Sequence, residues 1–282
     1  MTPNVIERAA ARLAEGGWRY TPRQLYYAVC EDLEKTRRRG VPSVATGEVG
    51  LGAVLILIAL ILIRYAIPFT ILLALGLLLI VTGAAARVQR PPPQRARVLA
   101  LSFTEFVDGL GATRPQGMLT SDEQESHPGS SDRANIVVVS DTLETVALIN
   151  ANRQHIGVDG AIALDSAALP LITKQRVVAV HDASPRGCAL ALELKDQGID
   201  AVDAGIRPRW VSRPERQILE GAPARLPRDL SAVLTADEID WLASGRRVEL
   251  ATLTPEQIAK LVWLAASRSD DTPGDDALLD LW

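Results

Sequence analysis

Cysteine, histidine and aromatic residues are all scarce in this chain of 282 residues. Its two cysteines, Cys30 and Cys188, both fall in segments that we place in the cytosol, where a stable disulfide is not expected. His181, one of three histidines, has no cysteine or histidine neighbour at the spacing of metal ligands, which argues against zinc. Neither Ser140 nor Ser184 lies in a Gly-x-Ser-x-Gly motif, so a hydrolase function has little support. No glycine-rich nucleotide-binding loop is present, so a nucleoside triphosphatase function has little support either.

A global positive charge is also absent, because the formal net charge is −4. No long-range field therefore attracts nucleic acid to the whole molecule. One local group of basic residues surrounds Trp210 and consists of Arg207, Arg209, Arg213 and Arg216. This group is suited to phosphate contacts in DNA. The same group would equally serve as a solvated face or bind anionic lipid headgroups, and the sequence leaves these alternatives open.

Hydrophobic residues make up 48% of the chain but aromatic residues only 4%, and much of this aliphatic excess lies in one run. Residues 49–86 contain a single charge, Arg64. A helix rises ~1.5 Å per residue, so ~20 residues cross ~30 Å of hydrocarbon. We therefore expect a transmembrane helical hairpin over residues 44–86, with a tight turn at residues 64–68. The alternative, a buried hairpin in a soluble core, is disfavoured because no soluble domain needs such a run.

Basic residues flank this run on both sides. Those before it are Lys35, Arg37, Arg38 and Arg39, and those after it are Arg87, Arg90, Arg95 and Arg97. By the positive-inside rule both flanks are cytoplasmic, so we expect a multi-pass protein of the cytoplasmic (inner) membrane with both termini in the cytoplasm. The polar and charged residues that precede the run are unlike a signal peptide.

Composition divides the rest of the chain into segments. Residues 1–43 form an N-terminal segment, and residues 87–133 form a linker in which a short helix or strand is expected only between Val98 and Leu110. Residues 134–268 alternate short apolar strands with helical patterns, and residues 269–282 form an acidic, solvated tail. Strands are expected at residues 136–139, 161–164, 177–181 and 199–202, with helices at 143–149 and 188–195. This alternation predicts an α/β domain with a small parallel sheet covered on both faces.

Polar side chains follow the predicted strands, at the edge where ligands gather in open α/β sheets. They are Ser140, Asp141, Asp165, His181 and Asp182. The stretches IVVVSDTLETVALI and VVAVHDASPRGCALAL, which contain most of them, resemble the TOPRIM fold of topoisomerases, primases and related nucleases. In that fold the first strand ends in Glu and the later one in Asp-x-Asp-x-x-Gly, and the resemblance implies that these acids hold Mg²⁺. Here Ser140 and Ser184 stand at two of the three acidic positions.

A second stretch, RYTPRQLYYAVCE at residues 19–31, resembles the Arg-x-x-Tyr-Tyr segment in the winged-helix domain of topoisomerase VI A subunits and their meiotic double-strand-break relatives. In that family one tyrosine attacks a DNA phosphodiester. Independently, the capping box at residues 21–24 predicts that a helix starts here. Helical periodicity places Tyr26 at the border of the core and leaves Tyr27 as the free phenol, with Arg23 one turn away as a suitable neighbour for a tyrosine nucleophile. Packing of both rings against a wing is the alternative.

A third stretch, RRVELATLTPEQI at residues 246–258, is similar to an Arg-Val-Glu-Leu-Asp-Ala-Leu segment near the end of TOPRIM domains in the same family. Glu249 keeps the family's glutamate, whereas Ala251 replaces its aspartate. Together the three stretches resemble the family over residues 4–36 and 134–265, and the hairpin between them departs from it.

The resemblance implies candidate sites with reduced chemistry. Asp182, Asp141 and Glu249 are the candidate Mg²⁺ ligands, but we expect Mg²⁺ to bind weakly and DNA cleavage to be severely impaired. Tyr27 and Arg23 are the candidate catalytic pair, either vestigial or active. For phosphate binding we expect Arg186 at a helix N-terminus, together with Arg207, Arg209 and Arg213. The structural alternative is that Asp182 only caps the helix after the turn.

These observations favour a membrane-anchored, degenerate TOPRIM and winged-helix protein that resembles the topoisomerase VI A subunit. We expect a non-catalytic scaffold rather than an enzyme, with the membrane, DNA and either a second copy of the chain or another protein as its partners. Two alternatives remain: an integral membrane interaction protein with no nucleic-acid role, and an active Mg²⁺-dependent enzyme that cleaves DNA through a tyrosine.

Overall fold

The computed structural model describes most of the chain outside its long apolar run. The described residues are 2–40, 99–111, 114–125, 136–157, 162–165, 175–212, 218–226 and 230–267. The predicted membrane hairpin at residues 44–86 and the acidic tail at residues 269–282 lie outside these ranges. Among the helices within them, none has the length and apolar character that a membrane crossing requires. Residues 1–32 and 94–282 belong to one compact unit, and residues 33–93 belong to a second.

A parallel sheet forms the centre of this unit. Its strands are β1 (Ile136–Ser140), β2 (Ile162–Asp165), β3 (Arg176–Val180) and β4 (Ala201–Asp203), in the order β2-β1-β3-β4. All three neighbouring pairs are parallel, and Ser140 at the end of β1 is in register with Val180 at the end of β3. The predicted parallel α/β architecture is therefore confirmed, although the fourth strand begins two residues later than expected.

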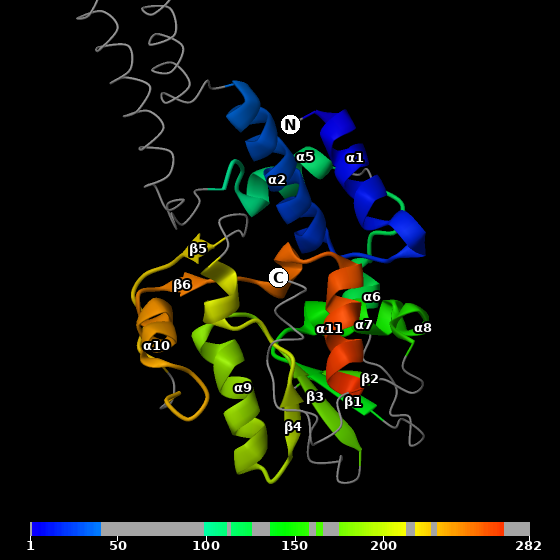
Figure 1. Ribbon diagram of the computed structural model, residues 1–282. Coiled ribbons are helices and arrows are strands. Elements are labelled where there is room, and N and C mark those ends of the chain that lie inside the picture. Colours follow the sequence, from blue (N-terminus) through cyan, green and yellow to red (C-terminus); the bar gives the residue numbers. More distant parts are fainter. Residues whose placement is uncertain are drawn as a thin grey trace, which may run out of the picture. The chain divides into compact units, whose positions relative to one another are not determined.

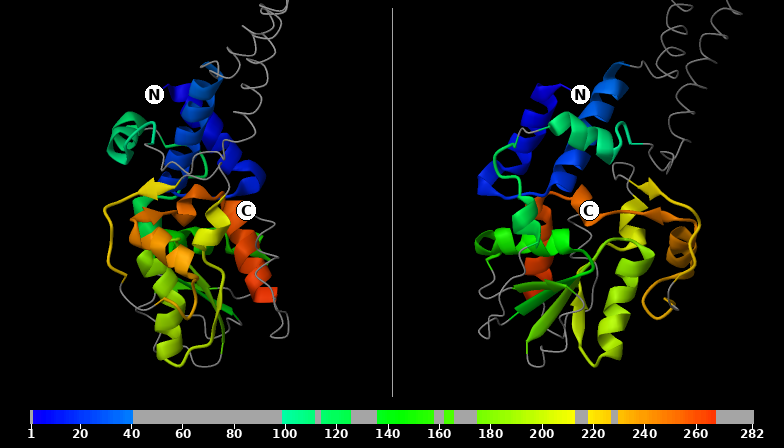
Figure 2. Two further views of the ribbon diagram at one scale, coloured as in Figure 1. Left: turned by 60° about the vertical axis from the view of Figure 1, so that its left-hand side comes forward. Right: turned by 180° about the vertical axis from the view of Figure 1, so that it is seen from behind.

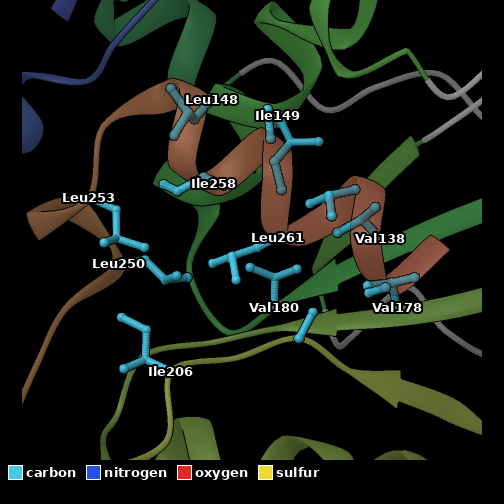
Figure 3. Close-up of a cluster of buried hydrophobic side chains, with 14 of the residues drawn as sticks. Val138, Leu148, Ile149, Val178, Val180, Ile206, Leu250, Leu253, Ile258 and Leu261 are labelled. Atoms are coloured by element: carbon cyan, nitrogen blue, oxygen red, sulfur yellow. The ribbon is translucent and has the colours of Figure 1, made fainter. Parts of the chain in front are cut away.

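Helices cover both faces of the sheet because alternate strand residues point to opposite sides. On one face the core side chains of β1 and β3 pack with α7 (Leu143–Ala151), α8 (Arg153–Ile156) and α11 (Pro255–Ser267), as Figure 3 shows for part of this cluster. On the other face, the intervening strand residues pack with Leu190 and Leu194 of α9 (Pro185–Asp196). Figure 1 shows α9 and α11 on either side of the strands.

A smaller structural layer lies beside α9 and completes the C-terminal region. It contains η4 (Pro208–Ser212), β5 (Leu219–Glu220), α10 (Ala236–Ala243), β6 (Arg246–Arg247) and η5 (Leu250–Thr252). β5 and β6 pair in antiparallel fashion. A reciprocal capping box between Thr235 and Glu238 fixes the start of α10, because each side chain bonds the other residue's backbone N–H.

The N-terminal helices are α1 (Pro3–Leu13), the short η1 (Glu15–Gly17) and α2 (Pro22–Gly40). The predicted capping box of α2 is confirmed, since the Gln24 N–H donates to Thr21 Oγ1 at 3.1 Å and the Thr21 N–H donates to Gln24 Oε1 at 3.0 Å. Two anchors join this region to the α/β part. The buried Asn152 amide bonds both the N–H and the carbonyl of Arg19, each at 2.8 Å, and Gln24 Nε2 donates to the Leu253 carbonyl at 2.9 Å.

The segment at residues 87–133, expected to be a linker, holds two helices within its described part. They are α5 (Phe103–Leu110), in the region where a helix or strand was expected, and α6 (Ser121–Glu125). Figure 2 shows α5 lying against α1 and α2, and Phe106 of α5 is fully buried. α5 thus lies where the sequence allowed a short helix or strand, and α6 lies in the stretch that was expected to be a flexible linker. Local capping boxes, Ser102 with Glu105 and Thr120 with Glu123, start the two helices in a stretch whose long-range apolar pattern is weak.

Candidate functional site

Tyr27 and Arg23 lie on consecutive turns of α2 and share one partner, Glu249. The Tyr27 hydroxyl donates to Glu249 Oε2 at 2.8 Å, and Arg23 Nη1 donates to the same oxygen at 2.7 Å. Arg23 Nε also lies 3.6 Å from Glu144 Oε2 of α7. The structure thus joins the N-terminal and C-terminal sequence stretches at one carboxylate within a single chain, and no second copy is needed for this contact.

The expectation that Tyr27 is a free phenol is wrong, because only 4% of its surface is exposed. Tyr26 is buried as well, and its hydroxyl donates to the Leu101 carbonyl at 2.7 Å. Its ring meets Phe103 and Phe106 of α5 at centroid distances of 5.3 and 5.6 Å. Helical periodicity of residues 22–33 could not reveal this layer, since α5 lies about 80 residues further along the chain.

Asp182 accepts a hydrogen bond from the backbone of Leu250, the residue that follows Glu249. Its Oδ1 accepts the N–H of Leu250 at 2.6 Å, so the end of β3 is tied to the start of η5. The alternative in which Asp182 caps the following helix is wrong. Ser184 is the N-cap of α9, and its hydroxyl accepts the Gly187 N–H at 3.0 Å. Gly187 is needed there because a Cβ would overlap the Asp182 carbonyl oxygen.

Asp141 follows β1 and approaches the same region from the neighbouring strand. A Cβ at Gly187 would lie 3.1 Å from Asp141 Oδ2, and Asp141 Oδ1 is buried without a hydrogen-bond partner in the described structure. Burial raises the pKa of Asp141. Burial, and then the negative charge of Asp141, raise the pKa of Asp182 to about 7. Ionisation of both Asp141 and Asp182, the two candidate metal ligands at the strand ends, is therefore unfavourable.

Asp182 borders a cleft of about 310 Å³ between α2, the start of α7 and the segment around η5. Its charged lining residues are Arg23, Glu144, Asp182 and Glu249, and Thr21, Gln24, Thr142 and Thr145 add polar groups. Burial raises the pKa of Glu144 as well. Ala251 also lines the cleft at the position where the resemblance implies an aspartate. The cleft is thus acidic, with one arginine.

Mg²⁺ does not fit this arrangement of side chains. Glu249 Oε2 already accepts two hydrogen bonds, and Asp182 Oδ1 accepts one from Leu250. Across the residues that the structure describes, no group of three or more His, Cys, Asp or Glu is placed to hold a metal ion. Ser184 is occupied as a helix cap, and Ser140 is fully buried at the end of β1. A Mg²⁺ site would require these carboxylates to exchange their present partners.

The predicted phosphate-binding residues are in different environments. Arg186 is exposed on the first turn of α9, and its charge partly offsets the rise that burial causes in the pKa of Asp141. Arg207 Nη2 pairs with Asp203 Oδ2 at 3.0 Å, and its side chain is only 17% exposed. Arg209 is more exposed and lies 4.0 Å from Glu238 Oε1, and both guanidinium groups face the Trp210 ring. Arg213 lies outside the described residues.

A buried ionic network that we did not predict lies at the ends of β3 and β4. His181 Nε2 is 3.1 Å from Asp203 Oδ1, and His181 Nδ1 is 2.8 Å from the Asp182 carbonyl oxygen. Since both ring nitrogens face acceptors, the imidazolium form satisfies both contacts. Burial lowers the pKa of His181, but the charge and hydrogen bond of Asp203 outweigh it and raise that pKa to about 8. Asp203 follows a predicted strand, so the rule that drew attention to Asp182 would also have found it.

No family model, no curated protein and no solved structure matches this chain.

Proposed function

We propose that this chain is a membrane-anchored, TOPRIM-like scaffold that binds DNA or a protein partner at the cytoplasmic face of the membrane without cleaving DNA. The observation that carries the proposal is the shared contact of Tyr27 and Arg23 with Glu249. A tyrosine nucleophile must lose its proton. Burial, and then the charge of Glu249, raise the pKa of Tyr27 far above its ordinary value, so the phenolate is strongly disfavoured.

The anchoring part of the proposal is supported by contacts across the apolar run. α2 precedes the run and α5 follows it, yet Tyr26 bonds the Leu101 carbonyl and packs on Phe103. Two flanks that fold against each other must lie on the same side of a membrane. Any membrane crossing between them therefore occurs an even number of times, which is consistent with a hairpin. The basic residues on both sides of the run favour the cytoplasmic side.

One specific observation favours a second candidate, which is DNA cleavage through Tyr27. A hydroxyl that donates to a carboxylate at 2.8 Å has the geometry of a nucleophile with its general base. Against this candidate, the cleft carboxylates do not fit Mg²⁺ as they are arranged, and Ser140, Ser184 and Ala251 replace acids that the resemblance implies.

Duplex DNA binding by the full-length protein in detergent micelles tests the proposal. We expect affinity that falls steeply with salt, with a slope of log affinity against log salt of about 0.9 per phosphate contact. Arg209→Ala combined with Arg213→Ala is expected to weaken binding and to flatten this slope, whereas Tyr27→Phe should change binding little. Binding that is absent, or that both arginine changes leave unaltered, would favour a membrane interaction protein with no nucleic-acid role.

Cleavage is measured in the same preparation with Mg²⁺ and supercoiled DNA. We expect no protein–DNA covalent adduct. Adducts that form with the natural sequence and disappear in Tyr27→Phe would establish the second candidate instead. Restoring the acids with Ser140→Glu and Ser184→Asp should tighten Mg²⁺ binding if the strand ends correspond to the TOPRIM positions.

A further inference from the structure

Arg23 connects acidic side chains that come from distant parts of the chain. Its Nη1 lies 2.7 Å from Glu249 Oε2, and its Nε lies 3.6 Å from Glu144 Oε2. Its backbone N–H also donates to Glu144 Oε1 at 3.3 Å. The guanidinium carbon lies 5.2 Å from the centroid of the Phe103 ring on α5. Three separate segments therefore hold this one side chain in place.

Within the cleft, Arg23 is the single positive charge among the described lining residues, which also include three acids, Glu144, Asp182 and Glu249. Asp141 adds a fourth negative charge close to Asp182. Acids this close together repel one another unless a cation lies between them. The Arg23 guanidinium supplies that charge to Glu144 and to Glu249 Oε2, the oxygen that Tyr27 also contacts, while Arg247 Nε lies 3.9 Å from Glu249 Oε1.

We propose that Arg23 is a built-in cation that keeps this cleft from binding divalent metal ions. A metal ion would compete with the guanidinium for Glu249 Oε2, and the two positive charges would repel each other at this distance. Tyr27 donates to the same oxygen from the next turn of α2. This inference concerns cation binding alone and does not depend on DNA binding.

Mn²⁺ binding to the full-length protein in detergent, measured from the electron paramagnetic resonance signal of free Mn²⁺, tests the proposal. The natural protein is expected to bind weakly, and Arg23→Gln is expected to bind Mn²⁺ at least about tenfold more tightly. Arg23→Lys, which keeps the charge, should remain weak. Adding Asp182→Asn or Glu249→Gln to Arg23→Gln should remove the gain, which would locate the ion in the cleft.

Arg19→Gln is the matched control. Arg19 Nη2 pairs with Glu123 Oε1 at 2.8 Å, so this change also frees a carboxylate from a guanidinium, but neither residue lines the cleft. It should leave Mn²⁺ affinity unchanged. An equal gain in Arg19→Gln would overturn the proposal, because the effect would then follow from net charge. Mn²⁺ binding by the natural protein as tight as that of a folded Arg23→Gln variant would also overturn it.

Phe103→Leu provides a second, milder variant in case Arg23→Gln does not fold. It removes the ring beneath the guanidinium but keeps an apolar side chain on α5. Weaker retention of Arg23 should raise Mn²⁺ affinity about threefold. No change in a folded Phe103→Leu protein, together with no gain or no folded protein for Arg23→Gln, would overturn the proposal. Circular dichroism melting establishes which variants are folded.

Discussion

Two groups of charged side chains lie at the carboxyl end of the same sheet, and their charges are balanced differently. Around β4, Asp203 has two basic partners, His181 at 3.1 Å and Arg207 at 3.0 Å. In the cleft, Glu144 and Glu249 share Arg23, while burial and then the charge of Asp141 raise the pKa of Asp182. The pKa of Asp203 is lowered despite its burial, through His181 and then Arg207, whereas that of Asp182 is raised to about 7. Charge balance, rather than residue type, separates the structural cluster from the candidate site.

The largest expected effect comes from breaking the balanced cluster. Asp203→Asn would leave the His181 imidazolium and the Arg207 guanidinium buried without their carboxylate. Removing one partner of a buried ionic network costs about 3–5 kcal/mol of unfolding free energy. Urea unfolding of the full-length protein in detergent, followed by circular dichroism, measures this loss. A loss below about 1 kcal/mol would show that the network does not stabilise the fold.

A steric change in the same cluster is expected to cost about 3 kcal/mol. Gly205 faces the His181 ring so closely that a Cβ would overlap it. Gly205→Ala should therefore displace the ring from Asp203, and its melting temperature should fall. Gly157→Ala is a control at another turn, where no atom lies within 4 Å of the added Cβ and only the backbone conformation is strained. A smaller loss in Gly205→Ala than in Gly157→Ala would contradict the packing argument.

The balanced cluster should also make stability depend on pH. The folded pKa of His181, about 8, exceeds its ordinary value of 6.5 through Asp203, the Asp182 carbonyl and Asp141. Its contribution is fully present below pH 6.5 and is lost as pH rises through 8. The difference corresponds to about 2 kcal/mol. Unfolding free energies measured from pH 6 to 9 should decline, and His181→Gln should remove most of the decline above pH 7. A flat profile in the natural protein would contradict the assignment.

The smallest expected effect comes from the cleft and has the opposite sign. Asp182→Asn keeps an oxygen that can accept the Leu250 N–H but removes one of the crowded negative charges. Stability at pH 8 should rise by up to about 1 kcal/mol, in contrast to the large loss in Asp203→Asn. The same unfolding assay compares the two variants directly. A loss of several kcal/mol in Asp182→Asn would show that the cleft is as balanced as the cluster around Asp203.

Local patterns were sufficient to predict the parallel sheet and the start of α2. Valine-rich stretches marked β1 and β3, and the capping box at residues 21–24 marked the helix. The rule that ligands lie at strand ends selected Asp141 and Asp182. Glu249 came only from the resemblance, and its hydrogen bond with Tyr27 joins residues 222 positions apart. No local pattern contains such a contact.

The incorrect predictions have a common cause, which is packing between distant segments. Tyr27 satisfies every local criterion for an exposed phenol, but it is buried, its hydroxyl donates to Glu249, and the Tyr26 ring lies 5.0 Å from its own ring. Arg207, by contrast, has a local partner, because Asp203 lies only four residues earlier in the chain. Asp203 directly follows the strand predicted at residues 199–202, so the rule that ligands lie at strand ends could have selected it.

The contact between Tyr26 and Leu101 has a consequence for how such a chain could arise. The two helices that bracket residues 41–98 already pack on each other, so this segment is connected to the folded unit as an insertion at a single place. Insertions are tolerated where the chain enters and leaves a domain at neighbouring points. Gain or loss of the apolar run in the course of evolution would therefore require one exchange of sequence and no rearrangement of the core.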